Sequence, residues 1–156
     1  LSSNKIKDFD EVVADWGNKE TGIRKIHYDN STLAFSPSAI VNGFAVFKVK
    51  GVQAIWHTSF VSRQYLDNTQ NKDRSLPAYS LSGVSFNYPI RLRGFLRELT
   101  VGLDVNNIFS AHVAASGWVY SAISDADGHP DSNRYYQLGF IPEAGTTAIA
   151  RLTLRF

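Results

Sequence analysis

The chain has 156 residues, a length typical of a single domain, with 16 Lys and Arg residues against 14 Asp and Glu. The net charge of +2 is too small to favour nucleic acid as a partner, and the absence of Cys excludes disulfides and thiolate metal sites. No segment approaches the ~20 apolar residues of a transmembrane helix, which excludes helical spans but leaves transmembrane strands open.

Alternation of apolar and polar residues is the dominant pattern along the chain, and it predicts about six β-strands. The opening segment SSNKIKDF has the pattern of the end of a strand, and the one helical candidate, FDEVVADWG at 9–17, is short and β-branched. Further strands are predicted at 39–49, 52–66, 78–88, 99–109 and 146–156. Only Lys50 and Gly51 separate the first two of these, which favours a tight hairpin.

The predicted connections differ in length in a regular way. Those at 50–51 and 89–97 are short, whereas those at 12–32, 67–77 and 111–135 are long, polar and rich in Gly, Asn and Asp. In an antiparallel up-and-down meander the connections alternate between the two ends of the sheet, so all the long ones fall at one end. Short turns at one end and long loops at the other are typical of transmembrane β-barrels of the outer membrane. The strands are also longer than the ~5–6 residues usual in soluble proteins.

The strand predicted at 99–109 has one apolar and one polar face. Asp104 and Asn106 lie on its polar face, and the last strand likewise carries Arg151 and Arg155 opposite its apolar residues. Such charges are common in a wide aqueous lumen, whereas burying them inside a small soluble barrel has a large cost in free energy. Alternation alone does not distinguish these two kinds of barrel. A soluble barrel is apolar inside and polar outside, and an outer-membrane barrel is the reverse. The residues predicted to face lipid are Leu99, Val101, Leu103, Val105, Leu152 and Leu154.

Aromatic residues gather near the predicted strand ends, an arrangement that suits two girdles at the membrane–water interfaces. The alternative is that aromatic residues are simply common in strands. The predicted girdles consist of Phe47, Tyr88 and Phe156 at the short-turn end, and of Phe60, Tyr65 and Phe109 at the loop end.

The stretch RQYLDNTQNKDRSLPAYSLSGVSFNY at 63–88 resembles the C-terminal part of TonB-dependent outer-membrane receptors, especially those of Bacteroidetes-type bacteria. In that family a strand ends in Q-Y-L-D-N-T-x-N, a loop carries R-x-L and the next strand opens with A-Y. LDVNNIFS at 103–110 resembles the family's V-N-N-L-F run, and SGWVYS at 116–121 resembles its N-G-W-x-Y loop. FIPEAGTTAIARLTLRF at 140–156 resembles its P-x-A-G ending and terminal strand. The resemblance covers roughly residues 1–156 in order.

This resemblance implies that residues 1–156 are the C-terminal part of a barrel of about 22 strands with a plugged lumen. Such receptors lie in the outer membrane of Gram-negative bacteria, with long loops outside the cell and the C-terminus in the periplasm. They bind a scarce nutrient (an iron chelate, cobalamin, a glycan or a peptide) and import it with energy from the TonB complex. No bond is broken, so we expect neither enzymatic activity nor a cofactor.

The partners implied by the family are the bilayer, the rest of the barrel with its plug, the TonB complex and the barrel-assembly machinery. In the family that machinery recognises a terminal aromatic residue, and the corresponding residue here is Phe156. Two alternatives remain at this point. One is a structural or adhesive outer-membrane barrel without energised import, and the other is a soluble β-barrel that binds a ligand.

Candidate ligand-binding residues lie in the predicted extracellular loops. Arg63, Lys72 and Arg74 form a basic cluster, together with Asp73, that suits an anionic ligand such as a metal chelate. Pairing of these charges with one another, or with groups of the lumen or plug, is the alternative. The complete predicted set is Arg63, Lys72, Arg74, Trp118 and Tyr120.

Metal-binding and catalytic patterns are weak. DADGHPD at 125–131 has alternating Asp residues followed by Gly, as calcium loops do, but it lacks the bidentate Glu of an EF-hand. A solvated loop with turn-forming residues explains this segment more simply. His112 and His129 share one predicted loop without a known metal-ligand spacing, so we expect no metal site. The sequence contains no motif of a serine hydrolase, a zinc protease or a phosphate-binding loop.

Overall fold

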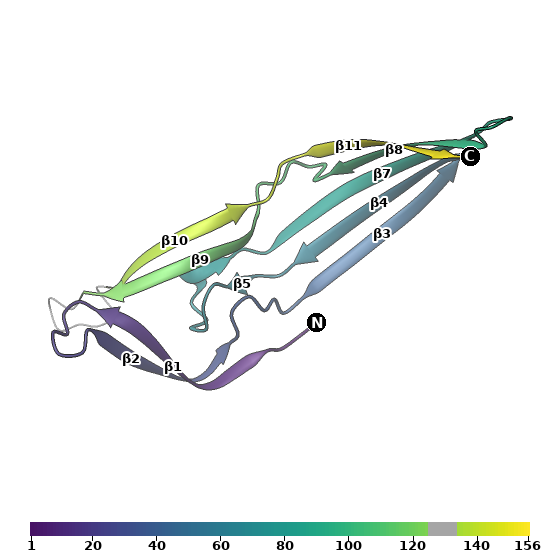
Figure 1. The fold of residues 1–156 in the computed structure, drawn as a ribbon. Helices are drawn as coiled ribbons and strands as arrows, with labels where there is room; N and C mark the ends of the chain where they lie inside the picture. Colours follow the sequence, from purple (N-terminus) through teal and green to yellow (C-terminus); the bar gives the residue numbers. More distant parts are fainter. Residues whose placement is uncertain (125–133) are drawn as a thin grey trace. The chain divides into compact units, whose positions relative to one another are not determined.

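The structure is a computed structural model that describes residues 1–124 and 134–156. These residues contain eleven strands and one short 3-10 helix. Within them, no helix is long and apolar enough to cross a membrane. The chain divides into two compact units (Figure 1). The first unit takes in Leu1–Ala39, Ser62–Ala78 and Ala114–Pro142, and the second takes in Ile40–Val61, Tyr79–Val113 and Glu143–Phe156.

The elements of the first unit are β1 (Lys5–Asp15), β2 (Ile23–Thr32), β5 (Gln64–Tyr65), η1 (Lys72–Arg74), β6 (Ser75–Leu76), β9 (Ala114–Ile123) and β10 (Arg134–Pro142). Four of these strands form one sheet in the order β10-β9-β1-β2, called the smaller sheet below. Its pairings are antiparallel except for a two-residue parallel contact between β1 and β9, in which Ala14 lies opposite Ala122. The strands β5 and β6 pair separately with each other.

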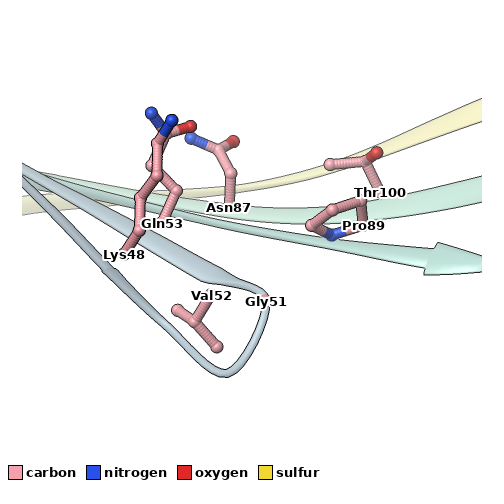
Figure 2. Close-up of a pocket in the computed structure, with 7 residues that line it drawn as sticks. All are labelled: Lys48, Gly51, Val52, Gln53, Asn87, Pro89 and Thr100. Atoms are coloured by element: carbon pink, nitrogen blue, oxygen red, sulfur yellow. The ribbon is translucent and has the colours of Figure 1, made fainter.

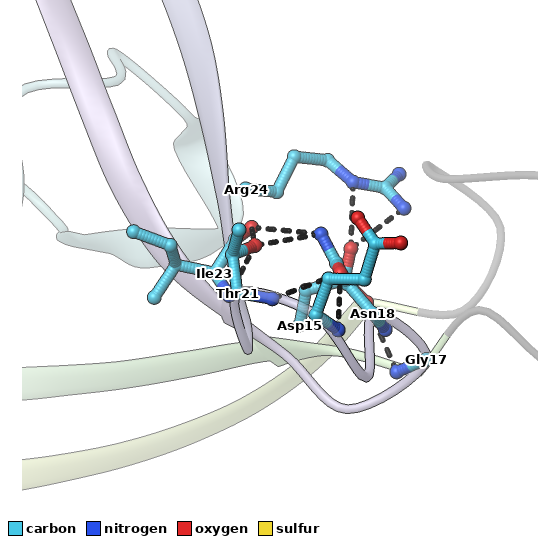
Figure 3. A network of polar contacts seen from close by, with 7 residues as sticks. Asp15, Gly17, Asn18, Thr21, Ile23 and Arg24 are labelled. Carbon is cyan, nitrogen blue, oxygen red and sulfur yellow. Dashed lines mark hydrogen bonds and ion pairs between the residues drawn. The ribbon is translucent and has the colours of Figure 1, made fainter.

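The connection between β1 and β2 is a turn held by several hydrogen bonds and an ion pair (Figure 3). The Asp15 carboxylate, which is 1% exposed, accepts hydrogen bonds from the backbone N–H groups of Gly17 and Asn18 and pairs with Arg24 at 2.7 Å. The Asn18 side chain accepts two more hydrogen bonds from backbone N–H groups within the turn. The prediction of one long loop over 12–32 is therefore wrong, because this segment is a β-hairpin.

The strands of the second unit are β3 (Ile40–Val49), β4 (Val52–Val61), β7 (Tyr79–Arg91), β8 (Glu98–Asn106) and β11 (Thr147–Arg155). They form one antiparallel sheet in the order β11-β8-β7-β4-β3, called the larger sheet below (Figure 1). Lys50 and Gly51 join β3 to β4 with φ angles of 48° and 85°. Two positive φ angles in a two-residue loop match the right-handed twist of the flanking strands, so the predicted hairpin is confirmed.

The number and closure of the strands differ from the sequence-based expectation. The all-β antiparallel class is confirmed, but the described residues contain eleven strands instead of the six predicted. The additional strands include β2 and β9, which fall within the predicted loops at 12–32 and 111–135, and β10, which lies mostly between the second loop and the strand predicted at 146–156. Both sheets are open in the described residues, with edges at β10 and β2 and at β11 and β3, so no closed barrel is formed by these residues. The simple up-and-down order is also interrupted, because β8 pairs with β11.

The connections of the larger sheet still show the expected asymmetry. The short turns at 50–51 and 92–97 lie at one end of the sheet. At the other end, the chain passes into and out of the first unit at every connection. The expectation that the short connections share one end is confirmed, although strands and hairpins occupy much of what the sequence predicts as long loops.

The buried apolar side chains of the described residues all belong to the first unit, and they are Val13, Leu66, Leu76, Ala122 and Ile123. The larger sheet is therefore a single layer whose own apolar side chains remain at least partly exposed. This difference between the units directs attention to the two faces of the larger sheet.

Candidate functional site

The strand register gathers the apolar residues of the larger sheet on one side, called the apolar face below. Directly opposite residues in paired antiparallel strands share a face. One row across the whole sheet consists of Ala45, Trp56, Val84, Val105 and Ala148. The next row consists of Phe47, Ala54, Phe86, Leu103 and Ala150. Two further rows, nearer the short turns, add Tyr88, Val101, Leu152, Ile90, Leu99 and Leu154. All six residues predicted to face lipid thus share this face.

The apolar face is open. Phe47 is 56% exposed, Leu103 is 40% exposed and Leu152 is 70% exposed. Monomeric soluble proteins rarely expose contiguous apolar patches of more than a few hundred Å². A face of this extent is typical of a surface that meets another apolar phase or partner.

Exposed aromatic side chains border the apolar face at its short-turn end. The Tyr88 ring packs against the hairpin, where a Cβ at Gly51 would lie 3.4 Å from its Cε2 atom. Phe95, in the 92–97 turn, contacts Phe156 with ring centroids 5.1 Å apart. Phe47, Tyr88 and Phe156 therefore lie at the predicted end. Phe60 and Phe109 lie at the opposite end of the larger sheet, and Tyr65 belongs to β5 of the first unit.

The opposite side of the larger sheet, called the polar face below, has a row consisting of Lys48, Gln53, Asn87, Gly102 and Arg151. The Arg151 guanidinium donates to Asn87 Oδ1 at 3.0 Å and lies 3.4 Å from the Asp104 carboxylate. It crosses β8 at Gly102, where a Cβ would come within 3.2 Å of Arg151 Nη2. Asp104 and Leu103 lie on opposite faces of the sheet, as alternation predicts, and their exposure to lumen and lipid stays a prediction.

A pocket of about 400 Å³ lies beside this row (Figure 2). The side chains of Lys48, Gln53 and Asn87 extend to the same side of the sheet, and Pro89 and Thr100 complete the wall. The polar face is not uniformly polar, however, because strand alternation also places Phe44 and Val46 of β3 on it. Phe44 is 80% exposed there.

A second polar cluster lies inside the first unit and joins segments far apart in the sequence. Arg74, which is 2% exposed, pairs with Glu11 at 3.1 Å and with Asp67 at 2.8 Å. Arg134 also binds the Glu11 carboxylate, and both guanidinium groups lie over the ring of Tyr136, at 5.0 Å for Arg74 and 5.6 Å for Arg134. Two cations thus share one carboxylate and one aromatic ring.

This arrangement changes the acidity of its members. Burial alone raises the pKa of Glu11, but the hydrogen bonds and positive charges of Arg134 and Arg74 outweigh it, so the pKa of Glu11 lies below its ordinary value. Tyr28 donates a hydrogen bond to Glu11 at 3.2 Å, and burial raises the pKa of Tyr28. The cluster is thus held in its ionised form, with Glu11 negative between two guanidinium groups.

The predicted ligand-binding residues do not form one surface cluster. Arg74 is buried in the ion pairs described above and is not a loop residue open to a ligand. Arg63 donates to Ser75 Oγ at 2.7 Å, and Lys72 lies exposed in η1. Of the alternatives left open by the sequence, pairing within the protein is the one observed for Arg74.

Trp118 and Tyr120 also differ from expectation, because they lie in β9 and not in an extracellular loop. Alternation along β9 places both on one face, where they are 49% and 46% exposed. The Trp118 ring lies across Gly139 of the neighbouring strand, where a Cβ would collide with it. The large Trp118 ring fits at this position because Gly139 has no side chain.

Two motifs that carry the family resemblance have definite structural roles. In the 63–76 stretch, Leu66 and Leu76 are buried, Asn68 accepts a hydrogen bond from the Ala34 N–H at 2.7 Å, and Asn71 caps η1. These bonds make the stretch a compact substructure of the first unit.

In the V-N-N-I-F run, the second asparagine, Asn107, has φ 49° and is 7% exposed. Its amide donates to the carbonyl oxygens of Ala111 and Ala144 and accepts from the Ala111 N–H. Asn107 therefore ties the end of β8 to the segment that precedes β11.

The segment at 125–131, which the sequence favours as a solvated loop over a calcium site, lies outside the described residues together with His129. Within residues 1–124 and 134–156, no group of three or more His, Cys, Asp or Glu side chains is placed to hold a metal ion.

No family of known proteins, no curated protein and no solved structure matches this chain.

Proposed function

We propose that the larger sheet is part of the wall of a transmembrane β-barrel in a bacterial outer membrane. The observation that carries this proposal is the exposed apolar face, which spans every strand of the sheet in register. Transmembrane strands need about 9–11 residues, and the strands of the larger sheet have 9 to 13. The polar face, with its Arg151–Asp104 pair, then lines an aqueous lumen.

The open edges of the larger sheet favour the same proposal. A sheet edge in lipid leaves unpaired backbone groups that cost several kcal/mol each, so spanning sheets are closed. The outer edges of β3 and β11 therefore pair with further strands of a complete barrel. The exposed aromatic residues at the short-turn end, Tyr88, Phe95 and Phe156, suit the periplasmic interface.

The activity that we propose for this barrel is energised nutrient import as a TonB-dependent receptor, with the C-terminus in the periplasm. The sequence resemblance described above supports it, and so does the structural role of Asn107 and of the 63–76 stretch within that resemblance. The TonB complex supplies the energy, the barrel-assembly machinery inserts the barrel, and no bond of the nutrient is broken.

Lipid exposure of the apolar face is the feature to test first. Residues 1–156 contain no Cys, so each substitution introduces the only thiol of this part of the protein. Any Cys elsewhere in the full-length protein is first replaced by Ser. In outer-membrane vesicles that contain the full-length protein, Leu103→Cys should react with a lipid-soluble thiol reagent, and Thr100→Cys, on the polar face of the same strand, should react with a water-soluble one. The reverse pattern, or equal labelling of both, would contradict the membrane proposal.

Import is tested separately in the host cell. Deletion of the gene should abolish growth on one limiting nutrient (an iron chelate, cobalamin, a glycan or a peptide), and loss of the TonB complex should have the same effect. Unchanged growth on all four classes, with the barrel present in the membrane, would support a structural or adhesive barrel instead.

A further inference from the structure

The pocket of about 400 Å³ on the polar face lies at the short-turn end of the larger sheet, beside the hairpin that joins β3 to β4. This volume is within the range of small-molecule sites in proteins. Four adjacent strands each contribute one polar side chain to it, and these are Lys48 of β3, Gln53 of β4, Asn87 of β7 and Thr100 of β8 (Figure 2).

The strand register and one hydrogen bond fix the central part of this pocket. Gln53 lies directly opposite Lys48 on one side and Asn87 on the other. The Arg151 guanidinium donates to Asn87 Oδ1 at 3.0 Å, so the amide oxygen is occupied and the Nδ2 group of Asn87 is left for a ligand. A group whose orientation is fixed in advance loses less conformational entropy when a ligand binds.

The other polar side chains of the pocket are available to a ligand. Within residues 1–124 and 134–156, the side chains of Lys48, Gln53 and Thr100 form no hydrogen bond or ion pair. Polar side chains that converge on a pocket without protein partners are the usual specificity elements of ligand sites.

Hydrogen-bond donors dominate the chemistry of the pocket. The Lys48 ammonium only donates, and Asn87 presents its NH₂ group because Arg151 occupies its oxygen. The Gln53 amide and the Thr100 hydroxyl can also donate. No Asp or Glu in the described part of the chain lines the pocket, so a cationic ligand would meet a positive charge without a carboxylate to balance it.

The surrounding polar face adds further positive charge. Between the row of Asp104 and the short turns, cationic side chains on this face outnumber carboxylates, because the strands place Lys48, Arg91, Arg151 and Arg155 there against Asp104 and Glu98. An excess of one sign of charge raises the local concentration of ions of the opposite sign. Both the pocket and its surroundings therefore favour an anion.

We propose that this pocket is a binding site for a small oxoanion that carries a phosphate or carboxylate group. Lys48 supplies the positive charge, and the oxygen atoms of the anion accept hydrogen bonds from Asn87, Gln53 and Thr100. The proposal goes beyond nutrient import and does not depend on it, because every group that carries it belongs to the larger sheet.

Calorimetric titration of the full-length protein in detergent micelles tests this site. The probes are inorganic phosphate and, separately, succinate, with sodium chloride added to keep the ionic strength constant. Saturable binding of at least one probe is expected, and the tighter of the two identifies the preferred group. Lys48→Gln should weaken this binding about tenfold, because a charge-assisted hydrogen bond is lost. Asn87→Asp should abolish it, because a carboxylate that still accepts from Arg151 replaces the donor.

Two matched variants control for changes of charge elsewhere on the protein. Lys25→Gln removes an equally exposed lysine from β2 of the first unit, and Asn42→Asp adds a carboxylate to the polar face of β3, about 20 Å along the strand from Lys48. Both should bind the probe as the unsubstituted protein does, and gel mobility before and after heating verifies that each variant is folded.

Three results overturn the proposal. The first is that neither phosphate nor succinate binds at constant ionic strength, and the second is that Lys48→Gln binds as the unsubstituted protein does. The third is that Lys25→Gln or Asn42→Asp weakens binding as much as the pocket variants, which would indicate attraction by net charge and not a defined site.

Discussion

Glu11 and Arg74 lie 63 positions apart in the sequence and form a 3.1 Å ion pair inside the first unit, with side chains 12% and 2% exposed. Arg134 reaches the same carboxylate from β10. The interior of the first unit is therefore held partly by charges that depend on one another. Breaking one buried pair leaves an uncompensated charge, which costs more than the intact pair contributes.

Arg74→Met should destabilise the first unit by about 3 kcal/mol, because Asp67 then loses its cation and Glu11 keeps only Arg134. The exposed neighbour Lys72 provides the control, and Lys72→Met should change stability by less than about 0.5 kcal/mol. Thermal unfolding of the full-length protein in detergent, followed by far-ultraviolet circular dichroism, measures both. Equal stability of the two variants would show that the ion pairs are not structural.

The lowered pKa of Glu11 predicts an acid-dependent loss of stability. Its contribution is fully present above the ordinary pKa of 4.5 and is lost as the pH falls through the lower pKa of the folded state. Glu11→Gln should therefore have a flatter stability profile on the acid side. A profile on the acid side identical to that of the unsubstituted protein would argue against this linkage.

The pKa of His27 shifts in the opposite direction to that of Glu11, so His27 serves as the comparison. Its hydrogen bond to Asp10 raises the pKa of His27, so its contribution is present below 6.5 and is lost as the pH rises through the higher folded-state pKa. Because His27 is exposed, we expect only a small loss of stability in His27→Gln, present on the acid side below 6.5 and absent once the pH exceeds the higher folded-state pKa. Titration of the His27 ring by nuclear magnetic resonance measures this shift directly.

Leu103→Arg should reduce the amount of folded barrel in membranes, because a charge on the lipid face near the bilayer midplane costs about 2–4 kcal/mol. Thr100→Arg lies on the polar face of the same strand and should be tolerated. Asp104 is a poorer control, because an arginine there would face Arg151, which is now paired with the Asp104 carboxylate. Heat-modifiable mobility in gels reports the folded fraction, and equal loss in both variants would contradict the assigned faces.

Asn107→Ala should destabilise the larger sheet by about 2–3 kcal/mol, because two carbonyl groups and one N–H group lose their partner and Ala at positive φ is strained. Asn107→Gly relieves the strain but not the lost hydrogen bonds, so it should retain most of the loss. The adjacent Asn106→Ala is the matched control and should be close to neutral. Chemical unfolding with urea separates the three variants.

Phe156→Ala should lower the amount of assembled protein in the outer membrane more than it lowers refolding in detergent. The Phe95–Phe156 contact accounts for only a modest folding loss, below the about 1.5–3 kcal/mol of a fully buried ring because Phe156 is 61% exposed, whereas recognition during assembly acts only in cells. Phe109→Ala, an exposed ring at the other end of the larger sheet, is the comparison. Quantitative immunoblots of membrane fractions should show the difference, and equal levels for the two variants would refute a special role of Phe156.

The sequence by itself determined the larger sheet. Alternation predicts the strands at 39–49, 78–88, 99–109 and 146–156, the Lys50–Gly51 hairpin and the opposite faces of Leu103 and Asp104. The strand predicted at 52–66 is too long, because β4 ends at Val61 and Gln64–Tyr65 form β5 of the first unit. Alternation is a local property, because neighbouring side chains of a strand point to opposite faces whatever the strand packs against. The sequence could therefore separate the apolar from the polar face without knowing any strand partner.

Only the tertiary structure decided the smaller sheet and the polar sites. The inward-facing positions of β1, β2 and β10 include Glu11, Tyr28 and Arg134, so hydrophobic periodicity does not mark these strands. The sequence predicts β2 and all of β9 as loops. Charged side chains become favourable interior residues only when a partner is brought to them, here across 63 positions for Arg74 and 123 for Arg134. The convergence of Gln53, Asn87 and Thr100 around one pocket likewise depends on which strands pair, a long-range choice that local pattern does not contain.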